Sequence, residues 1–388
     1  MRVLMVSTEY PPMPGGVGRY TANLVQAIRK VGVHVDVVCD KAGAGEFSGI
    51  SPTNEQNSDV LLRIVDEAAP DVVHVQFEPG LYGLVLDPGN PKKTNTHIDS
   101  FYERCRVPIV TTFHSAYTFR QWMSQAVLMK RIGRTGRLGI PARAAVRTWK
   151  YFLNYKAFND LNKEKLRMSH AGISFSRYLA RRIGGGEVIY HGAEPATSDM
   201  EKQDARSFFS LPKDKRIALV LGFRTATKGW DILNKMRMPE GWVMVLNSSK
   251  GHYNTENLSL NLRGDIIDLQ RGFLDEKELS MLLFASDAVI LPYKITSSSG
   301  VMFDALAHGL PFVASDLEFF REFSSQRLGV TVRRTPEDFS KGLERLSQEY
   351  DGYAQAVGRF REKLRWDYVA RQHVAQYASA MAASVQAA

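Results

Sequence analysis

Short apolar runs rich in β-branched residues recur along the chain, and most are separated by stretches with the hydrophobic spacing of helices. Such runs predict buried strands, and their alternation with helices is typical of βαβ units. In the first half they cover residues 3–6, 33–38, 72–75, 109–113, 172–175 and 188–190. A second series follows a polar stretch and covers residues 217–221, 242–246, 288–291 and 312–314. Because the runs are almost continuously apolar, we expect an α/β fold with parallel sheets covered on both faces.

The two series predict two domains of similar design, since a chain of 388 residues is too long for one ordinary core. We place one Rossmann-like domain at residues 1–193, a second at 205–365, and a C-terminal helix at 366–388. Open parallel sheets bind ligands beyond the carboxyl ends of their strands. Two such domains that face each other would therefore hold the ligand in the cleft between them.

Composition excludes several classes of protein. No apolar run approaches the roughly 18 to 20 residues that cross a bilayer, and the first residues read as a strand and not as a signal peptide. We therefore expect a cytoplasmic protein. Cys39 and Cys105 are the only cysteines, and their spacing fits neither zinc ligands nor a disulfide framework, so no metal is expected.

The net charge of +9 is concentrated in residues 118–168. Twelve Lys and Arg stand there against two acidic residues, whereas the rest of the chain has 38 basic and 39 acidic residues. Aromatic and aliphatic residues lie between these cations, as they do in segments that bind anionic membranes. A helical hairpin whose apolar face belongs to the core explains the pattern equally well. Nucleic acid is not expected as a partner, because no recognition motif accompanies the charge.

Residues 297–315 read as a polar loop, a helix, a turn and a buried strand. A loop with Ser299 that enters a helix at Gly300 and Val301 presents backbone N–H groups and the positive end of the helix dipole, which suit a phosphate. Asp304, about one turn later, is placed to reach a ribose hydroxyl.

Arg224 and Lys228 form a basic pair directly after the strand predicted at 217–221. Fixed cations at a strand end would stabilise the negative charge of a leaving diphosphate. Together with the loop at 297–300, they predict a diphosphate clamp.

Further motifs occur in an order that is found in one enzyme family. The sequence STEYPP at 7–12 precedes Gly15 and Gly16, His114 follows the strand predicted at 109–113, and VIYHGAEP at 188–195 closes the first half. With the basic pair and the loop–helix segment, these motifs cover nearly the whole chain and resemble the retaining glycosyltransferases of family 4. The resemblance implies the GT-B fold, two facing Rossmann-like domains with an interdomain cleft.

The resemblance also implies roles for single residues. Its catalytic positions are His114, beside the donor sugar, and Arg224 and Lys228, on the diphosphate. Its donor-binding positions are Gly15, Gly16, Phe273, Leu274, Thr296, Ser299, Gly300, Val301 and Asp304. The family has a Glu-x7-Glu motif, and both of its carboxylates differ here. Thr296 stands where a Glu usually contacts the sugar, and Asp304 where a Glu usually contacts the ribose.

On this resemblance we expect a metal-independent retaining hexosyltransferase that moves a sugar from a nucleoside-diphosphate sugar to an acceptor hydroxyl in glycan biosynthesis. The chain has no D-x-D triplet, which fits transferases that hold the leaving group without a metal. No cofactor is expected apart from the nucleotide-sugar substrate. Domain 1–193 would hold a glycan or lipid-linked acceptor and domain 205–365 the donor. The segment 118–168 would place the enzyme at the inner face of the membrane.

Three other functions stay open. A nucleotide-sugar 2-epimerase shares the fold and would form product without an acceptor, but it needs carboxylates near the sugar, and Thr296 removes one. A non-catalytic sugar-nucleotide-binding partner subunit would bind a donor without turnover. A dinucleotide dehydrogenase fits least, because the glycine fingerprint after the first strand is incomplete.

Overall fold

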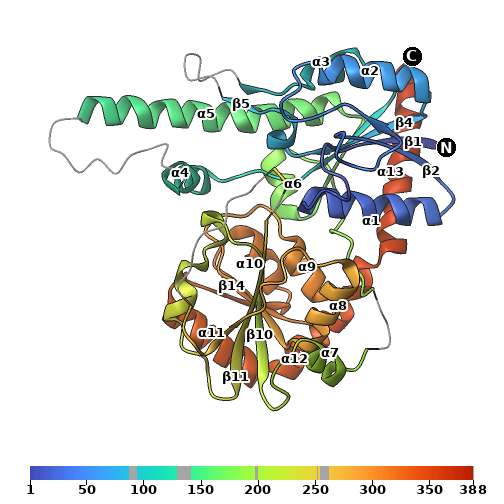
Figure 1. The fold of residues 1–388 in the computed structure, drawn as a ribbon. Coiled ribbons are helices and arrows are strands. Elements are labelled where there is room, and N and C mark those ends of the chain that lie inside the picture. Colours follow the sequence, from blue (N-terminus) through green and yellow to red (C-terminus); the bar gives the residue numbers. More distant parts are fainter. Residues whose placement is uncertain (87–93, 129–140, 197–199, 251, 254–261, 388) are drawn as a thin grey trace. The chain divides into compact units, whose positions relative to one another are not determined.

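The structure, a computed structural model, describes residues 1–86, 94–128, 141–196, 200–250, 252–253 and 262–387 (Figure 1). The chain forms two compact units. The first comprises Met1–Tyr190 and Asp367–Ala388, and the second comprises His191–Trp366. The second unit begins at His191, whereas the sequence analysis placed the start of the second domain at residue 205.

The first unit contains a seven-stranded sheet of order β3-β2-β1-β4-β7-β8-β9. Every neighbouring pair in this sheet is parallel. Its strands are β1 (Arg2–Val6), β2 (His34–Cys39), β3 (Phe47–Ser48), β4 (Val72–Phe77), β7 (Ile109–Phe113), β8 (Ala171–Ser174) and β9 (Glu187–Val188). A short antiparallel pair, β5 (Val85–Leu86) and β6 (Thr94–Asn95), is separate from the sheet.

Helices connect these parallel strands, as the βαβ pattern requires. They are α1 (Gly16–Lys30), α2 (Asn57–Ala68), η1 (Pro79–Tyr82), α3 (Asp99–Arg104), α4 (Phe119–Leu128), α5 (Pro141–Met168) and α6 (Arg177–Ile183). The C-terminal helix α13 (Trp366–Ala387) joins this unit from residue 367 onward. Figure 1 shows α13 beside β4, and the Tyr377 hydroxyl lies 2.7 Å from Nδ1 of His74 in that strand.

The second unit contains a six-stranded parallel sheet of order β12-β11-β10-β13-β14-β15. Its strands are β10 (Arg216–Phe223), β11 (Trp242–Ser249), β12 (Ile266–Asp268), β13 (Ala288–Leu291), β14 (Phe312–Ser315) and β15 (Gly329–Val332). Its helices are α7 (Lys202–Phe208), η2 (Ala226–Lys228), η3 (Trp230–Lys235), α8 (Glu276–Ala285), α9 (Gly300–Ala307), α10 (Glu318–Ser324), α11 (Pro336–Gln348), α12 (Tyr350–Phe360) and η4 (Arg361–Leu364).

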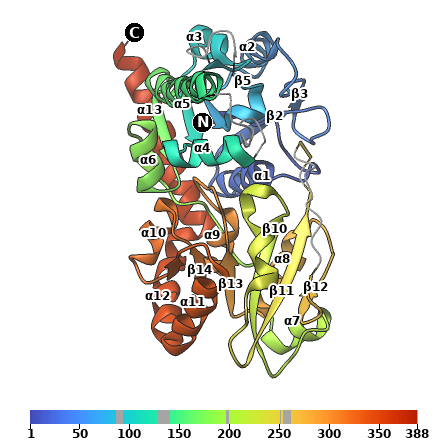
Figure 2. The ribbon, with the colours of Figure 1, turned by 90° about the vertical axis from the view of Figure 1, so that its left-hand side faces the viewer.

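One large core cluster lies on a face of the second sheet. Alternate residues of β10 and β11, among them Val220 and Met244, pack there against Trp230 of η3 and Phe339 of α11. Figure 2 shows α11 and α12 side by side against this sheet. Since β13 and β14 are buried at every position, helices must cover both faces of their strands.

The predicted α/β fold with parallel sheets is confirmed, because the apolar runs coincide with strands of the two sheets, except that only Val188 of the run 188–190 lies in a strand, β9. Among the residues that the structure describes, five strands were not predicted: β3, β5, β6, β12 and β15. These are only two to four residues long, so their sequences carry little periodicity.

Gly329 opens β15 at a place where no side chain fits. A Cβ atom on it would stand 2.4 Å from the Phe312 carbonyl oxygen and 2.6 Å from Cγ of that residue's ring. Because the obstacle includes the backbone of the paired strand β14, Gly329→Ala should lower the free energy of unfolding by about 1–3 kcal/mol in chemical denaturation.

Gly358→Ala is the matched control. Gly358 lies inside α12, and no atom stands within 4 Å of its Cβ position. Alanine is the better helix former by roughly 1 kcal/mol, so this variant should be at least as stable as the parent. Equal losses in both variants would contradict the steric explanation.

Candidate functional site

The loops after β10 and β13 carry the predicted basic pair and anion loop, and backbone contacts join them. The Lys294 N–H donates to the Thr227 carbonyl at 2.8 Å. Arg334 donates from Nε to the Pro292 carbonyl and from Nη2 to the Gly229 carbonyl, both at 2.9 Å. Gly229 has a φ of +72°, and a Cβ atom there would collide with the Pro292 oxygen. The two loops therefore form one braced surface at the carboxyl edge of the second sheet.

Helix α9 begins at this edge with a well-formed N-terminus. The Ser299 hydroxyl is buried, accepts a hydrogen bond from the Met302 N–H at 3.3 Å, and lies 3.3 Å from the Tyr293 hydroxyl. Gly300 is the first helical residue, and its Cβ position lies 3.4 Å from Nε2 of His191. A helix start of this kind offers backbone N–H groups and positive dipole charge to an anion.

The two predicted cations have different partners. Lys228 places Nζ 3.8 Å from the centroid of the Tyr293 ring, a cation–π contact. Arg224 donates from Nη2 to Oδ2 of Asp268 at 3.0 Å and lies over the Trp230 ring. Sequence reasoning missed Asp268, which ends the short strand β12 and carries no motif of its own. A diphosphate bound by Arg224 would have to share it with this carboxylate.

The two positions that replace the family's Glu residues lie in the same loop–helix segment. Thr296 is 6% exposed, and its hydroxyl donates to the Ser298 carbonyl. Asp304 lies in the second turn of α9 and is 4% exposed. Val301 is half-buried beside Gly222 at the end of β10, with Cγ2 3.8 Å from that glycine's Cβ position. The structure thus brings the predicted residues of this segment to one edge of the sheet.

A buried amide holds the loop that carries Phe273 and Leu274. Asn247 of β11 donates from Nδ2 to the Gly272 carbonyl and accepts from the Arg271 N–H, both at 3.0 Å. Phe273 is exposed and Leu274 is buried. Asn247 was not predicted, although a polar residue directly after an apolar strand pattern is a signal that could have found it.

The glycine loop of the first unit is filled by a carboxylate of the protein itself. Glu9 accepts from the Gly18 N–H at 3.4 Å, and a Cβ atom on Gly15 would lie 2.2 Å from Glu9 Oε2. Gly16 has open space around its Cβ position. Burial raises the pKa of Glu9, while the Gly18 and Val17 amides lower it. A side chain at position 15 would therefore displace the Glu9 carboxylate.

His114 stands directly after β7, at the carboxyl edge of the first sheet. Its Nε2 lies 2.9 Å from Oε1 of Gln76 in the neighbouring strand β4. The rings of Tyr20 and Phe175 pack edge-on against it at 5.6 and 5.1 Å. These contacts fix the ring plane of a residue that was predicted from its place after a strand.

Glu78 is a neighbour of His114 that sequence reasoning missed. The residues before them, Phe77 and Phe113, are paired in register between β4 and β7. Burial raises the pKa of Glu78 to about 7, and the nearby Glu9 adds to the rise, while hydrogen bonding at Ser115 and Gly80 opposes it. No sequence motif identifies Glu78, because the raised pKa of its carboxyl depends on the residues that surround it in the fold.

The basic segment 118–168 combines core packing with an exposed face. Lys165 is 2% exposed and pairs with Asp99 at 3.0 Å, so at least this cation is structural. Phe158 and Leu161 belong to the core. Phe119, Trp149 and Phe152 are exposed, with 60% for Trp149. Four of the twelve cations, at residues 130, 131, 134 and 137, lie outside the described residues.

Two kinds of feature are absent from the described ranges. No helix there is long and apolar enough to cross a membrane. In the same ranges, no three His, Cys, Asp or Glu side chains stand close enough together to hold a metal ion.

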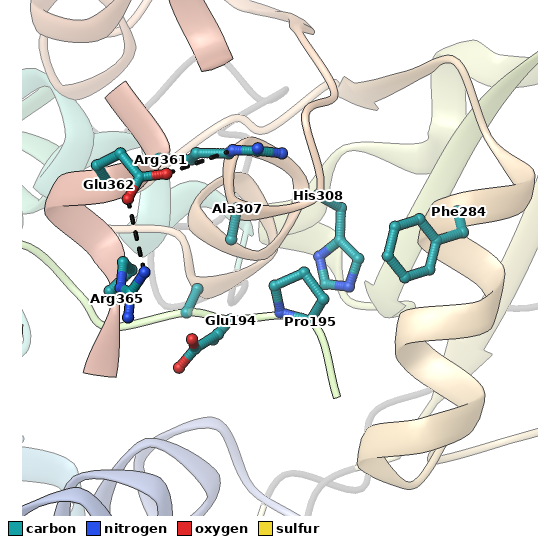
Figure 3. Close-up of a pocket in the computed structure, with 9 residues that line it drawn as sticks. Glu194, Pro195, Phe284, Ala307, His308, Arg361, Glu362 and Arg365 are labelled. Atoms are coloured by element: carbon teal, nitrogen blue, oxygen red, sulfur yellow. Dashed lines mark ion pairs between the residues drawn. The ribbon is translucent and has the colours of Figure 1, made fainter. Parts of the chain in front are cut away.

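A cavity of about 320 Å³ lies in the second unit (Figure 3). Glu362 stands between Arg361 and Arg365 at its rim, with ion-pair distances of 3.7 and 3.8 Å, and His308 at the end of α9 faces Phe284. None of the predicted site residues lines this cavity, so we do not assign it to the donor site.

Comparisons with known proteins agree with this architecture. Residues 14–151 match the family model Glycosyltransferase Family 4. An uncharacterised glycosyltransferase of Methanocaldococcus jannaschii is 23% identical over 412 residues, which covers 98% of this chain and 99% of that protein. Sucrose-phosphate synthase of Thermosynechococcus elongatus has a similar structure, with a TM-score of 0.67, 16% identity and coverage of 99% of this chain and 100% of that one. Anabaena HepE in complex with UDP and glucose gives a TM-score of 0.64, 13% identity and coverage of 98% and 100%.

The two parallel-sheet units and the likeness along the whole chain define a protein of the GT-B fold. The family match over residues 14–151 and the curated relative support a glycosyltransferase of the family 4 type.

The raised pKa of Glu78 predicts a pH-dependent stability difference. Between about pH 4.5 and 7 the folded protein keeps the Glu78 proton that the unfolded chain has lost, so Glu78 makes the protein less stable as pH rises through that window. Glu78→Gln removes this dependence. The free energy of unfolding of Glu78→Gln relative to the parent should therefore rise by about 2–3 kcal/mol between pH 5 and pH 8 in urea titrations.

Glu55→Gln serves as the control, because Glu55 is exposed on the same unit. Its stability relative to the parent should be the same at both pH values. A pH-independent difference for Glu78→Gln as well would show that the Glu78 carboxyl ionises alike in the folded and unfolded chain.

Proposed function

We propose that this glycosyltransferase is a metal-independent retaining enzyme that transfers a hexose from a nucleoside-diphosphate sugar to an acceptor hydroxyl in glycan biosynthesis. The observation that carries the proposal is the braced pair of loops after β10 and β13. Tyr293 contacts both the lysine of the first loop and the helix start that follows the second. Its ring faces Lys228, and its hydroxyl lies beside Ser299, the N-cap of α9. A cation next to a helix N-terminus suits a diphosphate. The UDP and glucose in the similar HepE structure support a nucleotide-sugar donor.

Within this site we assign the diphosphate to Arg224, Lys228 and the N–H groups of Gly300 and Val301. Arg224 Nε is buried and has no hydrogen-bond partner among the described residues. The guanidinium has five donors, so it can bind a phosphate oxygen while it keeps its contact with Asp268.

The resemblance supports the assignment of the remaining residues to the rest of the donor. We assign Asp304 to the ribose, Phe273 and Leu274 to the nucleobase, Gly16 with Gly15 to close backbone approach, and His114 with Thr296 to the sugar. Asp304 has a shorter arm than the family's Glu, and the Thr296 hydroxyl is engaged by the Ser298 carbonyl. We therefore expect weaker binding at the sugar than at the diphosphate.

In the proposed reaction, the bond between the anomeric carbon and the diphosphate oxygen breaks while the acceptor oxygen attacks the same face of the sugar. The leaving diphosphate takes the proton of the acceptor hydroxyl. Negative charge on the diphosphate rises in the transition state, and fixed positive groups stabilise it there. Lys228, Arg224 and the α9 N-terminus supply that charge in this proposal.

Replacement of Lys228 tests this assignment. Lys228→Met keeps most of the length of the side chain and removes its charge. We expect kcat/KM to fall by about 10²- to 10³-fold in donor assays, because the transition state loses a charge contact. In calorimetric titrations with UDP, GDP, ADP and dTDP, the diphosphate that the parent binds best should also bind more weakly to the variant.

Lys235→Met, an exposed lysine of η3 in the same unit, is the matched control and should behave as the parent does. Turnover of Lys228→Met within a few-fold of the parent would refute the role of Lys228. Product without an acceptor would favour a 2-epimerase. Tight nucleotide binding without turnover of any donor would favour a non-catalytic partner subunit, a function that the loss of Glu at position 296 also supports.

We further propose that the acceptor is lipid-linked and that the segment 118–168 lies on an anionic membrane surface. A cluster of three exposed aromatic residues supports this proposal. The ring centroids of Trp149 and Phe152 are 5.5 Å apart, and those of Phe119 and Phe152 are 5.6 Å apart. The net charge of the segment would attract anionic headgroups, while exposed aromatic rings enter the lipid interface.

The double variant Trp149→Ser/Phe152→Ser should bind anionic vesicles less well. We expect at least a severalfold loss in cosedimentation with vesicles that contain phosphatidylglycerol, and the parent's binding should weaken with salt. Phe208→Ser is the control, because Phe208 is a similarly exposed aromatic residue of the second unit. Equal binding of the parent to neutral vesicles, or no binding to either kind, would contradict the membrane proposal.

A further inference from the structure

A set of buried polar side chains connects His114 with the C-terminal helix. His74 and Gln76 alternate along β4 and so lie on the same face of the sheet. His373 and Tyr377 are one turn apart on α13, the helix that contacts this face. All four side chains are completely buried. Buried polar groups need internal partners, so the contacts among them decide their protonation and orientation.

The contacts form a continuous line. Nε2 of His114 lies 2.9 Å from Oε1 of Gln76, and Nε2 of Gln76 lies 3.3 Å from Nε2 of His74. Nδ1 of His74 then lies 2.7 Å from the Tyr377 hydroxyl. The Thr112 hydroxyl also contacts Nε2 of His74, at 2.8 Å.

The amide of Gln76 determines which groups donate and which accept in this series of hydrogen bonds. Its nitrogen lies 3.2 Å from Sδ of Met5 as well as near His74, and a thioether sulfur accepts hydrogen bonds but cannot donate them. The NH2 group therefore points toward Met5 and His74, and the amide oxygen points toward His114. Because that oxygen only accepts, Nε2 of His114 must carry a hydrogen.

His74 can accept from this amide because it is neutral. Burial is the main cause that lowers the pKa of His74 well below its usual range, and electrostatic coupling to the neighbouring imidazoles of His373 and His114 acts in the same direction. A neutral His74 that accepts at Nε2 carries its hydrogen on Nδ1 and donates it to the Tyr377 hydroxyl. Tyr377 thus holds the far end of the line.

Helix α13 also contacts a residue that packs against the His114 ring. Tyr20, which packs edge-on against His114, has its hydroxyl 3.4 Å from Nε2 of His373. The C-terminal helix is therefore connected both to a residue that fixes the ring plane and to the residues that fix the ring's hydrogen.

We propose that Gln76 is a positioning residue that holds His114 as the Nε2–H tautomer, and that His74 and Tyr377 hold Gln76 in the required orientation. In this tautomer the neutral ring has its lone pair on Nδ1, so it accepts a hydrogen bond from a hydroxyl there and does not donate one. The functional consequence rests on the proposed role of His114 at the donor sugar. A tautomer fixed in advance removes one source of unproductive binding before the sugar arrives.

The test is the tautomer of His114 measured by nitrogen-15 NMR of the full chain labelled at histidine. The signals of His114 among the nine histidines are identified by their loss in His114→Gln. The parent should show the Nε2–H tautomer. In Gln76→Leu the ring should become a mixture of both tautomers, and kcat should fall roughly 10- to 100-fold while the affinity for the nucleoside diphosphate stays within about twofold.

Two further variants separate positioning from simple packing. Tyr377→Phe keeps the ring and removes the hydroxyl that holds His74, so it should shift the tautomer in the same direction as Gln76→Leu and to a smaller extent. Thr112→Val removes a different buried hydroxyl that contacts His74, and it should leave the tautomer of His114 unchanged.

An Nδ1–H tautomer in the parent, or a single Nε2–H tautomer that persists in both Gln76→Leu and Tyr377→Phe, would overturn the inference whatever the activity. The reverse case is distinct. If the tautomer shifts as expected but His114→Gln transfers sugar as fast as the parent, the positioning by Gln76 stands and the proposed role of His114 at the sugar is wrong.

Discussion

The burial of parallel strands on both faces is the constraint on which the rest of this structure depends. Every residue of β4, β13 and β14 is buried, so a polar side chain inside such strands needs an internal partner. His74 and Gln76 meet this requirement through each other and through α13. Groups that must meet a ligand can stand only where strands end. His114 and Arg224 both directly follow a carboxyl end, as ligand-binding residues of open α/β sheets do.

The same constraint explains how charges are handled. Carboxylates and cations near the sheets have specific protein partners: Glu9 at the start of α1, Asp268 on Arg224, and Asp99 on buried Lys165. Lys228 differs, because the partner recorded for it is the face of an aromatic ring. A ring holds a cation in place without supplying a counter-charge, which fits the anion-binding role proposed for Lys228.

Whether the sequence alone predicts a feature of this structure depends on how far apart in the chain the residues that determine the feature lie. The strands, the α9 start at Gly300 and the positions of Arg224 and Lys228 follow from local patterns of apolar residues, glycine and charge. The pairing of Arg224 with Asp268 and of His74 with Tyr377 joins residues 44 and 303 positions apart. Such contacts appear only when the fold is known, because no local pattern encodes them. Position 15 shows the same limit, because the group that a side chain there would meet is the Glu9 carboxylate, which no local pattern identifies.

The membrane-binding hypothesis rests partly on a local sequence pattern and partly on burial that only the structure shows. Charge counting marks the segment 118–168 correctly as unusual, but it cannot tell which side chains are structural. Lys165, Phe158 and Leu161 belong to the interior, whereas Trp149 and Phe152 are exposed. An interpretation from sequence alone must treat them alike, because amphipathic spacing on a long helix does not show which neighbours cover each face.

The stereochemistry of the transferred sugar would show directly whether the enzyme uses the proposed retaining mechanism. Nucleotide-sugar donors of known anomeric configuration would be incubated with the enzyme and acceptor alcohols, and the configuration of the product would be read from its proton NMR coupling constants. The proposed mechanism predicts transfer with the anomeric configuration of the donor retained. An inverted product, or no transfer from any nucleotide sugar to any acceptor, would contradict it.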